Sequence, residues 1–117
     1  MPASLKVLIV EDSRDDAELL ARELRNAGFD PDWKRVETEG DFRASLEDPP
    51  DLIISDYTMP QFSGLRAMGL LRERGLDIPF LLISGRVGEE KAVEAMKQGV
   101  TDYLLKDRLG RLGKAGL

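Results

Sequence analysis

Polar side chains able to bind a metal or an anion stand directly after the apolar runs of this 117-residue chain. They are Glu11 and Asp12 after run 7–10, Ser55 and Asp56 after run 52–54, Ser84 after run 80–83, and Lys106 after run 103–105. Carboxylates brought together repel one another, and a divalent cation such as Mg²⁺ relieves that repulsion. With a hydroxyl and an ammonium group added, such a set suits phosphoryl transfer, in which a carboxylate can be the nucleophile and form an aspartyl phosphate.

Five short β-rich segments would carry these side chains. Residues 7–10, 52–54 and 80–83 are unbroken apolar runs, which is typical of parallel strands covered on both faces. Residues 33–36 and 103–105 are weaker runs, and we expect them nearer the edges of the sheet. Ligands of open α/β sheets bind beyond the carboxyl ends of the strands. The predicted strands therefore place the carboxylate, hydroxyl and ammonium side chains at one edge of the sheet.

Amphipathic helices are predicted between the strands. The first has a capping pattern at Ser13 and Asp16 and ends at Gly28. Its apolar face, spaced as in a helix, consists of Ala17, Leu20, Ala21 and Leu24. The apolar positions of the next three helices are Phe42 and Leu46, then Leu65, Met68 and Leu71, and then Ala92, Val93 and Met96. A fifth helix starting at Lys106 would be short, because the tail is rich in glycine.

The alternation of strands and helices predicts an α/β fold. We expect a doubly wound five-stranded parallel sheet with helices on both faces and a short last helix. The length of the chain fits a single domain over residues 1–117, and a domain of this size buries roughly two thirds of its unfolded surface.

The composition excludes several kinds of chemistry. The chain has no Cys and no His, so disulfides, thiolate sites and imidazole catalysis are excluded. A net charge of −5 makes direct DNA binding by this domain improbable. No apolar run approaches the roughly 20 residues of a membrane span, and the N-terminus does not read as a signal peptide. We therefore expect a cytoplasmic protein without membrane contact.

Several residues near the strand ends have an ordinary structural interpretation. A single polar residue after a strand is usually a solvated loop residue or a helix cap. The residues interpreted in this way, or as helix starts, are Ser13, Asp15, Asp16, Ser63 and Gly64.

From Lys6 to about Leu109 the sequence resembles the receiver domain of two-component response regulators. The motifs that carry the resemblance are Glu11-Asp12, Asp56-Tyr57-Thr58-Met59-Pro60 with Gly64, Ser84-Gly85, and Tyr103-Leu104-Leu105-Lys106. The resemblance implies a flavodoxin-like fold with strand order 2-1-3-4-5, in which the first and third strands are neighbours. The run 100–109 is similar to receivers found in hybrid sensor kinases.

The resemblance implies Mg²⁺ as the cofactor and assigns its ligands. Asp12 and Asp56 would bind the ion directly, together with the backbone carbonyl of Thr58. Glu11 would hold it through water.

The resemblance also implies a phosphorylation-dependent switch. Asp56 would be the phosphoacceptor, and Lys106 would pair with the phosphoryl oxygens. Ser84 would hydrogen-bond the phosphoryl group and move toward it, and the side-chain rotamer of Tyr103 would follow Ser84. The added charge would then change the surface around these residues.

The partners implied are a sensor histidine kinase or a histidine phosphotransfer protein, which would supply the phosphoryl group from a phosphohistidine. An effector or kinase domain in the parent protein is a further partner. One departure from the family pattern is Asp107, which stands where receivers usually have a proline after the lysine with a cis peptide bond. A cis bond before a non-proline residue costs about 2.5–4 kcal/mol, so a trans bond and a strained bond both remain open.

Three other functions share parts of this pattern. A pseudo-receiver would keep the fold without the chemistry, but Asp12, Asp56, Ser84 and Lys106 are all present. An aspartyl phosphatase usually carries Asp-x-Asp after the strand of its nucleophile, whereas this chain has Asp56-Tyr57-Thr58. A nucleotide-binding protein would have a glycine-rich loop after the first strand, and none follows Val10.

Overall fold

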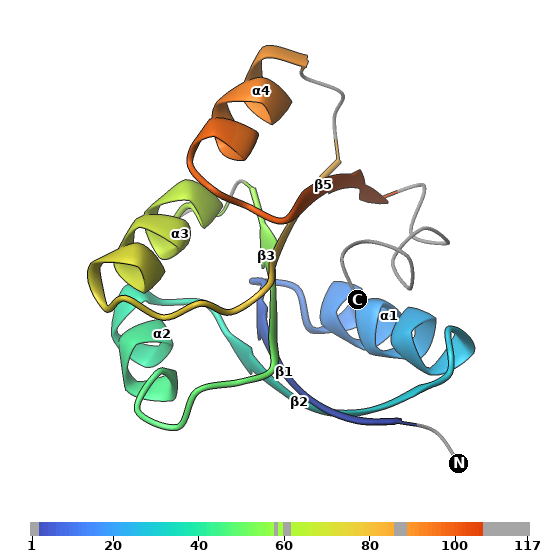
Figure 1. The fold of residues 1–117 in the computed structure, drawn as a ribbon. Coiled ribbons are helices and arrows are strands. Elements are labelled where there is room, and N and C mark those ends of the chain that lie inside the picture. Colours follow the sequence, from blue (N-terminus) through green and yellow to red (C-terminus); the bar gives the residue numbers. More distant parts are fainter. Residues whose placement is uncertain (1–2, 58, 60–61, 86–88, 107–117) are drawn as a thin grey trace.

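The computed structural model describes residues 3–57, 59, 62–85 and 89–106, and within them a five-stranded sheet packs against four helices (Figure 1). The strands are β1 (Ala3–Val10), β2 (Phe29–Val36), β3 (Leu52–Asp56), β4 (Phe80–Ser84) and β5 (Asp102–Leu105). The helices are α1 (Arg14–Asn26), α2 (Glu39–Ser45), α3 (Gly64–Glu73) and α4 (Glu89–Lys97). Every strand pair is parallel, and the order is β2-β1-β3-β4-β5. The predicted flavodoxin-like fold is confirmed, while the predicted last helix falls outside the described residues.

The alternation of side chains along the strands creates two separate cores. On one face, Val7, Ile9 and Ile54 pack with the buried residues of α1. On the other face, Leu8 and Ile53 belong to a core shared with α2, α3 and α4. Of the described helices, Figure 1 shows α1 on one side of the sheet and α2, α3 and α4 on the opposite side. Covering both faces explains why β3 and β4 are buried along their whole length.

Both edge strands were identified, but one was predicted too short. β2 begins at Phe29, four residues before the predicted start at Trp33. The sequence obscures this because Asp30-Pro31-Asp32 contains a proline, which lacks the amide proton that a central strand needs. Pro31 is tolerated because β2 lies at the edge of the sheet, with only β1 as a neighbour.

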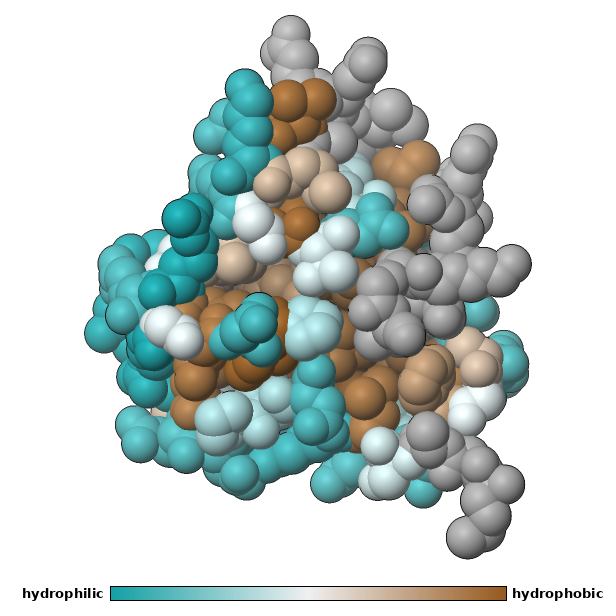
Figure 2. All heavy atoms as spheres, in the orientation of Figure 1, coloured by the Kyte–Doolittle hydropathy of each residue, from teal (hydrophilic) through white to brown (hydrophobic). Residues whose placement is uncertain are grey.

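The apolar face predicted for α1 is confirmed, whereas in α4 the helix is confirmed but the predicted packing positions Val93 and Met96 are wrong. Ala17, Leu20, Ala21 and Leu24 are all buried. In α4, by contrast, Val93 and Met96 are about half exposed, and Ala95 is the residue that packs into the core. Figure 2 shows apolar side chains on the surface at α4, next to polar ones.

Within the described part of the chain, no helix is both long and apolar enough to cross a membrane. The helix end predicted at Gly28 is confirmed, and α4 likewise ends before a glycine, Gly99; the two backbones have φ values of 97° and 100°. This left-handed conformation is easy for glycine and strained for other residues.

Candidate functional site

The carboxyl ends of four strands converge on one edge of the sheet. Asp56 pairs with Ile83 across β3 and β4, and Ser84 pairs with Leu105 across β4 and β5. β1 ends one residue before Glu11 and lies beside β3. The topology thus brings together side chains that are far apart in the sequence, as the predicted strand order required.

Three carboxylates form the centre of the site. One oxygen each of Glu11, Asp12 and Asp56 lies within 4.8 Å of the others. Glu11 and Asp56 are buried, whereas Asp12 is exposed. Buried carboxylates are costly without a compensating charge, and Mg²⁺ prefers carboxylate oxygens while keeping several waters. The donor atoms and the open side at Asp12 therefore fit a hydrated divalent cation.

Lys106 brings a positive charge into the site. Its Nζ lies 3.1 Å from Asp16 Oδ2, 3.5 Å from Asp56 Oδ2 and 3.6 Å from Glu11 Oε2. Partial burial opposes the charged form of this amine, but the hydrogen bond to Asp16 and the charges of Glu11 and Asp56 outweigh burial and raise the pKa to about 12. Lys106 is therefore a permanent cation held among three carboxylates.

Glu11 is the most perturbed acid of the site. Burial is the main cause that raises its pKa to about 7, and a side-chain hydrogen bond with Asp12 and the charge of Asp56 add to it. The backbone N–H of Ser13 donates to Glu11 Oε1 at 3.1 Å and opposes the shift, as does Lys106. A cation at the site would favour the ionised form of Glu11.

The backbone around Asp56 is fixed by close packing against α3. A Cβ placed on Gly64 would lie 2.5 Å from Leu82 Cδ1 and 2.6 Å from the carbonyl oxygen of Asp56. The Gly64 N–H also donates to the carbonyl of Tyr57 at 3.2 Å. The interpretation of Gly64 as only a helix start was therefore incomplete, because no larger residue fits there. Ser63 does cap the helix, since its Oγ accepts from the Arg66 N–H.

The switch residues of the prediction lie along β4 and β5. Ser84 is buried at the end of β4. The Tyr103 ring packs edge-on against Tyr57, with centroids 6.2 Å apart. The Tyr103 hydroxyl is buried and, within the described residues, has no hydrogen-bond partner. A buried hydroxyl without a partner costs about 1–3 kcal/mol, which opposes the packing of this ring.

Asp16 is the site residue that sequence reasoning missed. It was interpreted as a solvated or capping residue, and its backbone N–H does donate to Ser13 Oγ at 3.2 Å. Its carboxylate, however, makes the shortest of the contacts to Lys106. The reciprocal half of the expected capping box is absent here, because the Ser13 N–H donates to Glu11. No local sequence pattern predicts this contact, because 90 residues separate Asp16 from Lys106.

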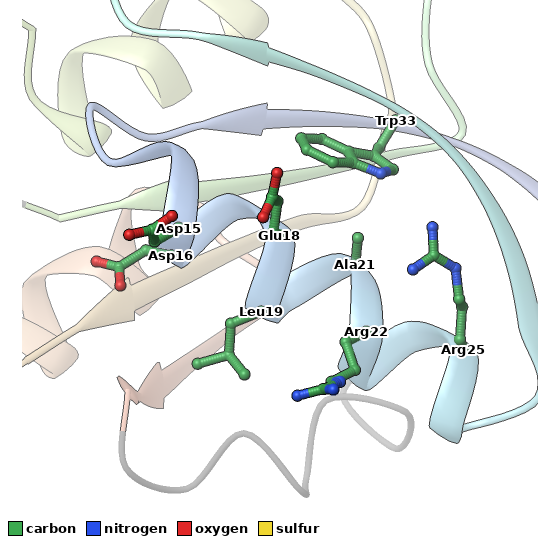
Figure 3. Close-up of a pocket in the computed structure, with 8 residues that line it drawn as sticks. All are labelled: Asp15, Asp16, Glu18, Leu19, Ala21, Arg22, Arg25 and Trp33. Atoms are coloured by element: carbon green, nitrogen blue, oxygen red, sulfur yellow. The ribbon is translucent and has the colours of Figure 1, made fainter.

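A shallow groove of about 700 Å³ runs along α1 beside the site (Figure 3). Asp16 lies at one end of it and Trp33 faces it from β2. Its other lining residues are Asp15, Glu18, Leu19, Ala21, Arg22 and Arg25. The groove does not include the three central carboxylates, so it is separate from the candidate metal site.

Two sequence expectations concern residues that are not described. The carbonyl of Thr58, the expected third metal ligand, and the Lys106–Asp107 peptide bond both lie outside the described residues. The remaining predicted residues, namely Glu11, Asp12, Asp56, Ser84, Tyr103 and Lys106, all lie in the described part of the chain.

The fold and the acidic site define a receiver domain, and comparison with known proteins agrees. The family model of the response regulator receiver domain matches residues 7–115. The chain belongs to this family, the signalling domain of two-component systems.

Relatives include response regulator protein FleR of Pseudomonas aeruginosa, which is 37% identical over 102 residues, covering 86% of this chain and 21% of FleR. The phosphate regulon transcriptional regulatory protein PhoB of Klebsiella pneumoniae is 35% identical over 107 residues, covering 86% of this chain and 44% of PhoB. This chain therefore spans less than half the length of these curated relatives.

Solved structures share the fold. A LuxR-family two-component response regulator from Aurantimonas sp. superposes with a TM-score of 0.83 at 22% identity, covering 97% of this chain and 82% of that chain. The Mn²⁺-bound form of response regulator Rcp1 superposes with a TM-score of 0.77 at 22% identity, covering 94% of this chain and 89% of that chain.

Proposed function

We propose that Asp56 accepts a phosphoryl group, in a Mg²⁺-dependent step, from a phosphohistidine on a sensor histidine kinase or a histidine phosphotransfer protein. The observation that carries this proposal is the position of Asp56, which is buried, lies within 4.8 Å of two other carboxylates and lies 3.5 Å from the Lys106 ammonium. A nucleophilic carboxylate, a cation site and a fixed ammonium are the groups that phosphoryl transfer to an aspartate requires.

The cation would be held by residues of the acidic cluster. Asp12 and Asp56 would bind it directly with the carbonyl of Thr58, and Glu11 would hold it through water. When bound, Mg²⁺ neutralises the negative charge that gathers on the transferred group. The Mn²⁺ in the Rcp1 structure supports a divalent cation in a protein of this fold.

In the transfer itself, a carboxylate oxygen of Asp56 attacks phosphorus. The bond from phosphorus to the donor imidazole nitrogen breaks, and its electron pair stays on that nitrogen. Lys106 lies close enough to Asp56 to move onto the new phosphoryl oxygens with a small side-chain rotation. Burial of Asp56 strengthens this attraction, because the local dielectric constant is lower than that of water.

The phosphoryl group would then act as a switch. Ser84, at the end of the strand beside Asp56, would donate its hydroxyl to a phosphoryl oxygen and move toward it. Tyr103 would change its rotamer in response. The Tyr103 hydroxyl is buried and has no hydrogen-bond partner in the described part of the chain, which supports this role, because an outward rotation would expose the hydroxyl to water.

The output of the signal would be produced outside this domain. We propose that residues 1–117 form one receiver domain in the cytoplasm and that the output is delivered by an effector or kinase domain of the parent protein or by a separate partner. This domain would not itself bind DNA, consistent with its net charge of −5.

A mapping experiment tests the acceptor assignment. The protein is incubated with acetyl phosphate and Mg²⁺ and then reduced with borohydride, which converts an aspartyl phosphate to homoserine. Peptide mass spectrometry should find homoserine at position 56 in the wild type and in the control Asp77→Asn, a variant of an exposed aspartate. Homoserine at another aspartate would contradict the assignment.

A further inference from the structure

Lys106 and a bound Mg²⁺ would compete for the same carboxylates. In the structure the ammonium lies 3.5 Å from Asp56 and 3.6 Å from Glu11, and both belong to the acidic cluster that fits the cation. Two cations that share these oxygens repel each other, and the repulsion is strong where water is largely excluded. The site therefore needs a second place for the ammonium when the metal is present.

Asp16 offers that place. Its Oδ2 is the nearest carboxylate oxygen to Lys106 Nζ, at 3.1 Å, and the contact has hydrogen-bond geometry. Asp16 approaches from the first turn of α1 and, among the described residues, is not part of the acidic cluster. Its side chain is 44% exposed, whereas the side chains of Glu11 and Asp56 are buried. Figure 3 shows its carboxylate at the start of α1, away from the body of the helix.

We propose that Asp16 is a positioning residue for Lys106, which holds the ammonium aside and so leaves Asp56 and Glu11 to the metal. This inference rests on the proposed Mg²⁺ site. Without Asp16, Lys106 keeps only the carboxylates of the metal site as partners among its described ion pairs. The ammonium then becomes a direct competitor of Mg²⁺, and the affinity for the metal falls.

Calorimetric titration of the whole chain with Mg²⁺ tests this through binding, without phosphorylation. Asp16→Asn keeps the shape of the side chain and should raise the Kd for Mg²⁺ about fivefold, by losing one charged partner of Lys106. Asp15→Asn is the matched control, because Asp15 lies on the same turn, carries the same charge and makes no described ion pair with Lys106. We expect it to raise the Kd less than about twofold.

A second background separates positioning from simple attraction between Asp16 and the metal. This background is Lys106→Met, which removes the ammonium. When Asp15→Asn and Asp16→Asn are each added to it, both should raise the Kd for Mg²⁺ by the same factor. An effect of Asp16→Asn that is equally large with and without Lys106 would overturn the positioning role. Asp16→Glu should restore most of the affinity, which loss of folding would not explain.

The outcomes distinguish this inference from the function on which it rests. A wild type that binds no Mg²⁺ would overturn both. Mg²⁺ binding that is equal in the wild type, Asp15→Asn and Asp16→Asn would overturn the role of Asp16 and leave the metal site intact.

Discussion

The ammonium of Lys106 lies 3.5 Å from Asp56 Oδ2, although 50 residues separate them in the sequence. The contact exists because β3 and β5 end at the same edge of a parallel sheet with β4 between them. It places a cation directly beside the proposed phosphoacceptor, and the function of Lys106 can be tested by substitution.

Replacement of Lys106 by Met should separate metal binding from phosphorylation. Mg²⁺ binding should persist and become tighter, because a competing cation is lost. Phosphoryl uptake from acetyl phosphate should slow by roughly ten- to a hundredfold, because a charge that stabilises the transferred group is gone. Titration calorimetry and intact-mass time courses measure the two properties. If neither changes, Lys106 is only a surface residue.

Glu11 should make stability depend on pH in the absence of metal. Its pKa is raised from 4.5 to about 7 in the folded protein, so between these values the folded state holds a proton that the unfolded chain has lost. The contribution of Glu11 to the free energy of unfolding therefore falls as the pH rises through this window and stays low above it. Across this window the free energy of unfolding should fall by at most about 3 kcal/mol through Glu11.

Glu11→Gln removes this titration. Urea unfolding in EDTA at pH 5 and pH 8 should show the variant gaining stability over the wild type as the pH rises. A difference between the two proteins that is the same at both values would mean that Glu11 titrates normally.

The fold was largely predictable, because burial dictates the strand patterns. The apolar runs of β3 and β4 are continuous because helices cover both faces of the sheet. The alternation of five strands with helices then predicts that the strands are parallel. β2 was predicted too short because a proline is acceptable only on an edge strand, and a single sequence does not reveal which strand is at the edge.

The site was predictable only in part. Glu11, Asp56, Ser84 and Lys106 follow strands, so their convergence follows from the topology. Asp16 does not follow this rule, because it lies inside a helix and reaches Lys106 only through the packing of α1 beside the end of β5. Such a contact depends on tertiary placement and leaves no periodic signal.

Gly64 should be intolerant of even one added methyl group. A Cβ there would lie 2.6 Å from the Asp56 carbonyl oxygen, so Gly64→Ala must displace either α3 or the backbone of the phosphoacceptor. We expect a loss of about 1–3 kcal/mol in the free energy of unfolding. Gly69→Ala is the control, because nothing lies within 4 Å of its added Cβ, and it should stabilise α3 by up to about 1 kcal/mol. Equal effects of the two substitutions would refute the close approach.

Removing the hydroxyl of Tyr103 should stabilise the unphosphorylated protein. The hydroxyl is buried without a described partner, so Tyr103→Phe should add about 1 kcal/mol to the free energy of unfolding. Tyr103→Leu, which also loses the ring contact with Tyr57, should destabilise it. Thermal unfolding measures both. A clear loss of stability in Tyr103→Phe would show that the hydroxyl is satisfied.

Intact-mass spectrometry after incubation with acetyl phosphate, with and without Mg²⁺, is the most direct test of Asp56 as the phosphoacceptor, with Asp56→Asn measured beside the wild type. We expect one phosphoryl adduct on the wild type, formed only with Mg²⁺ and lost in base, and none on the variant. An adduct of the same size on Asp56→Asn, or one that forms equally well without Mg²⁺, would show that Asp56 is not the Mg²⁺-dependent acceptor.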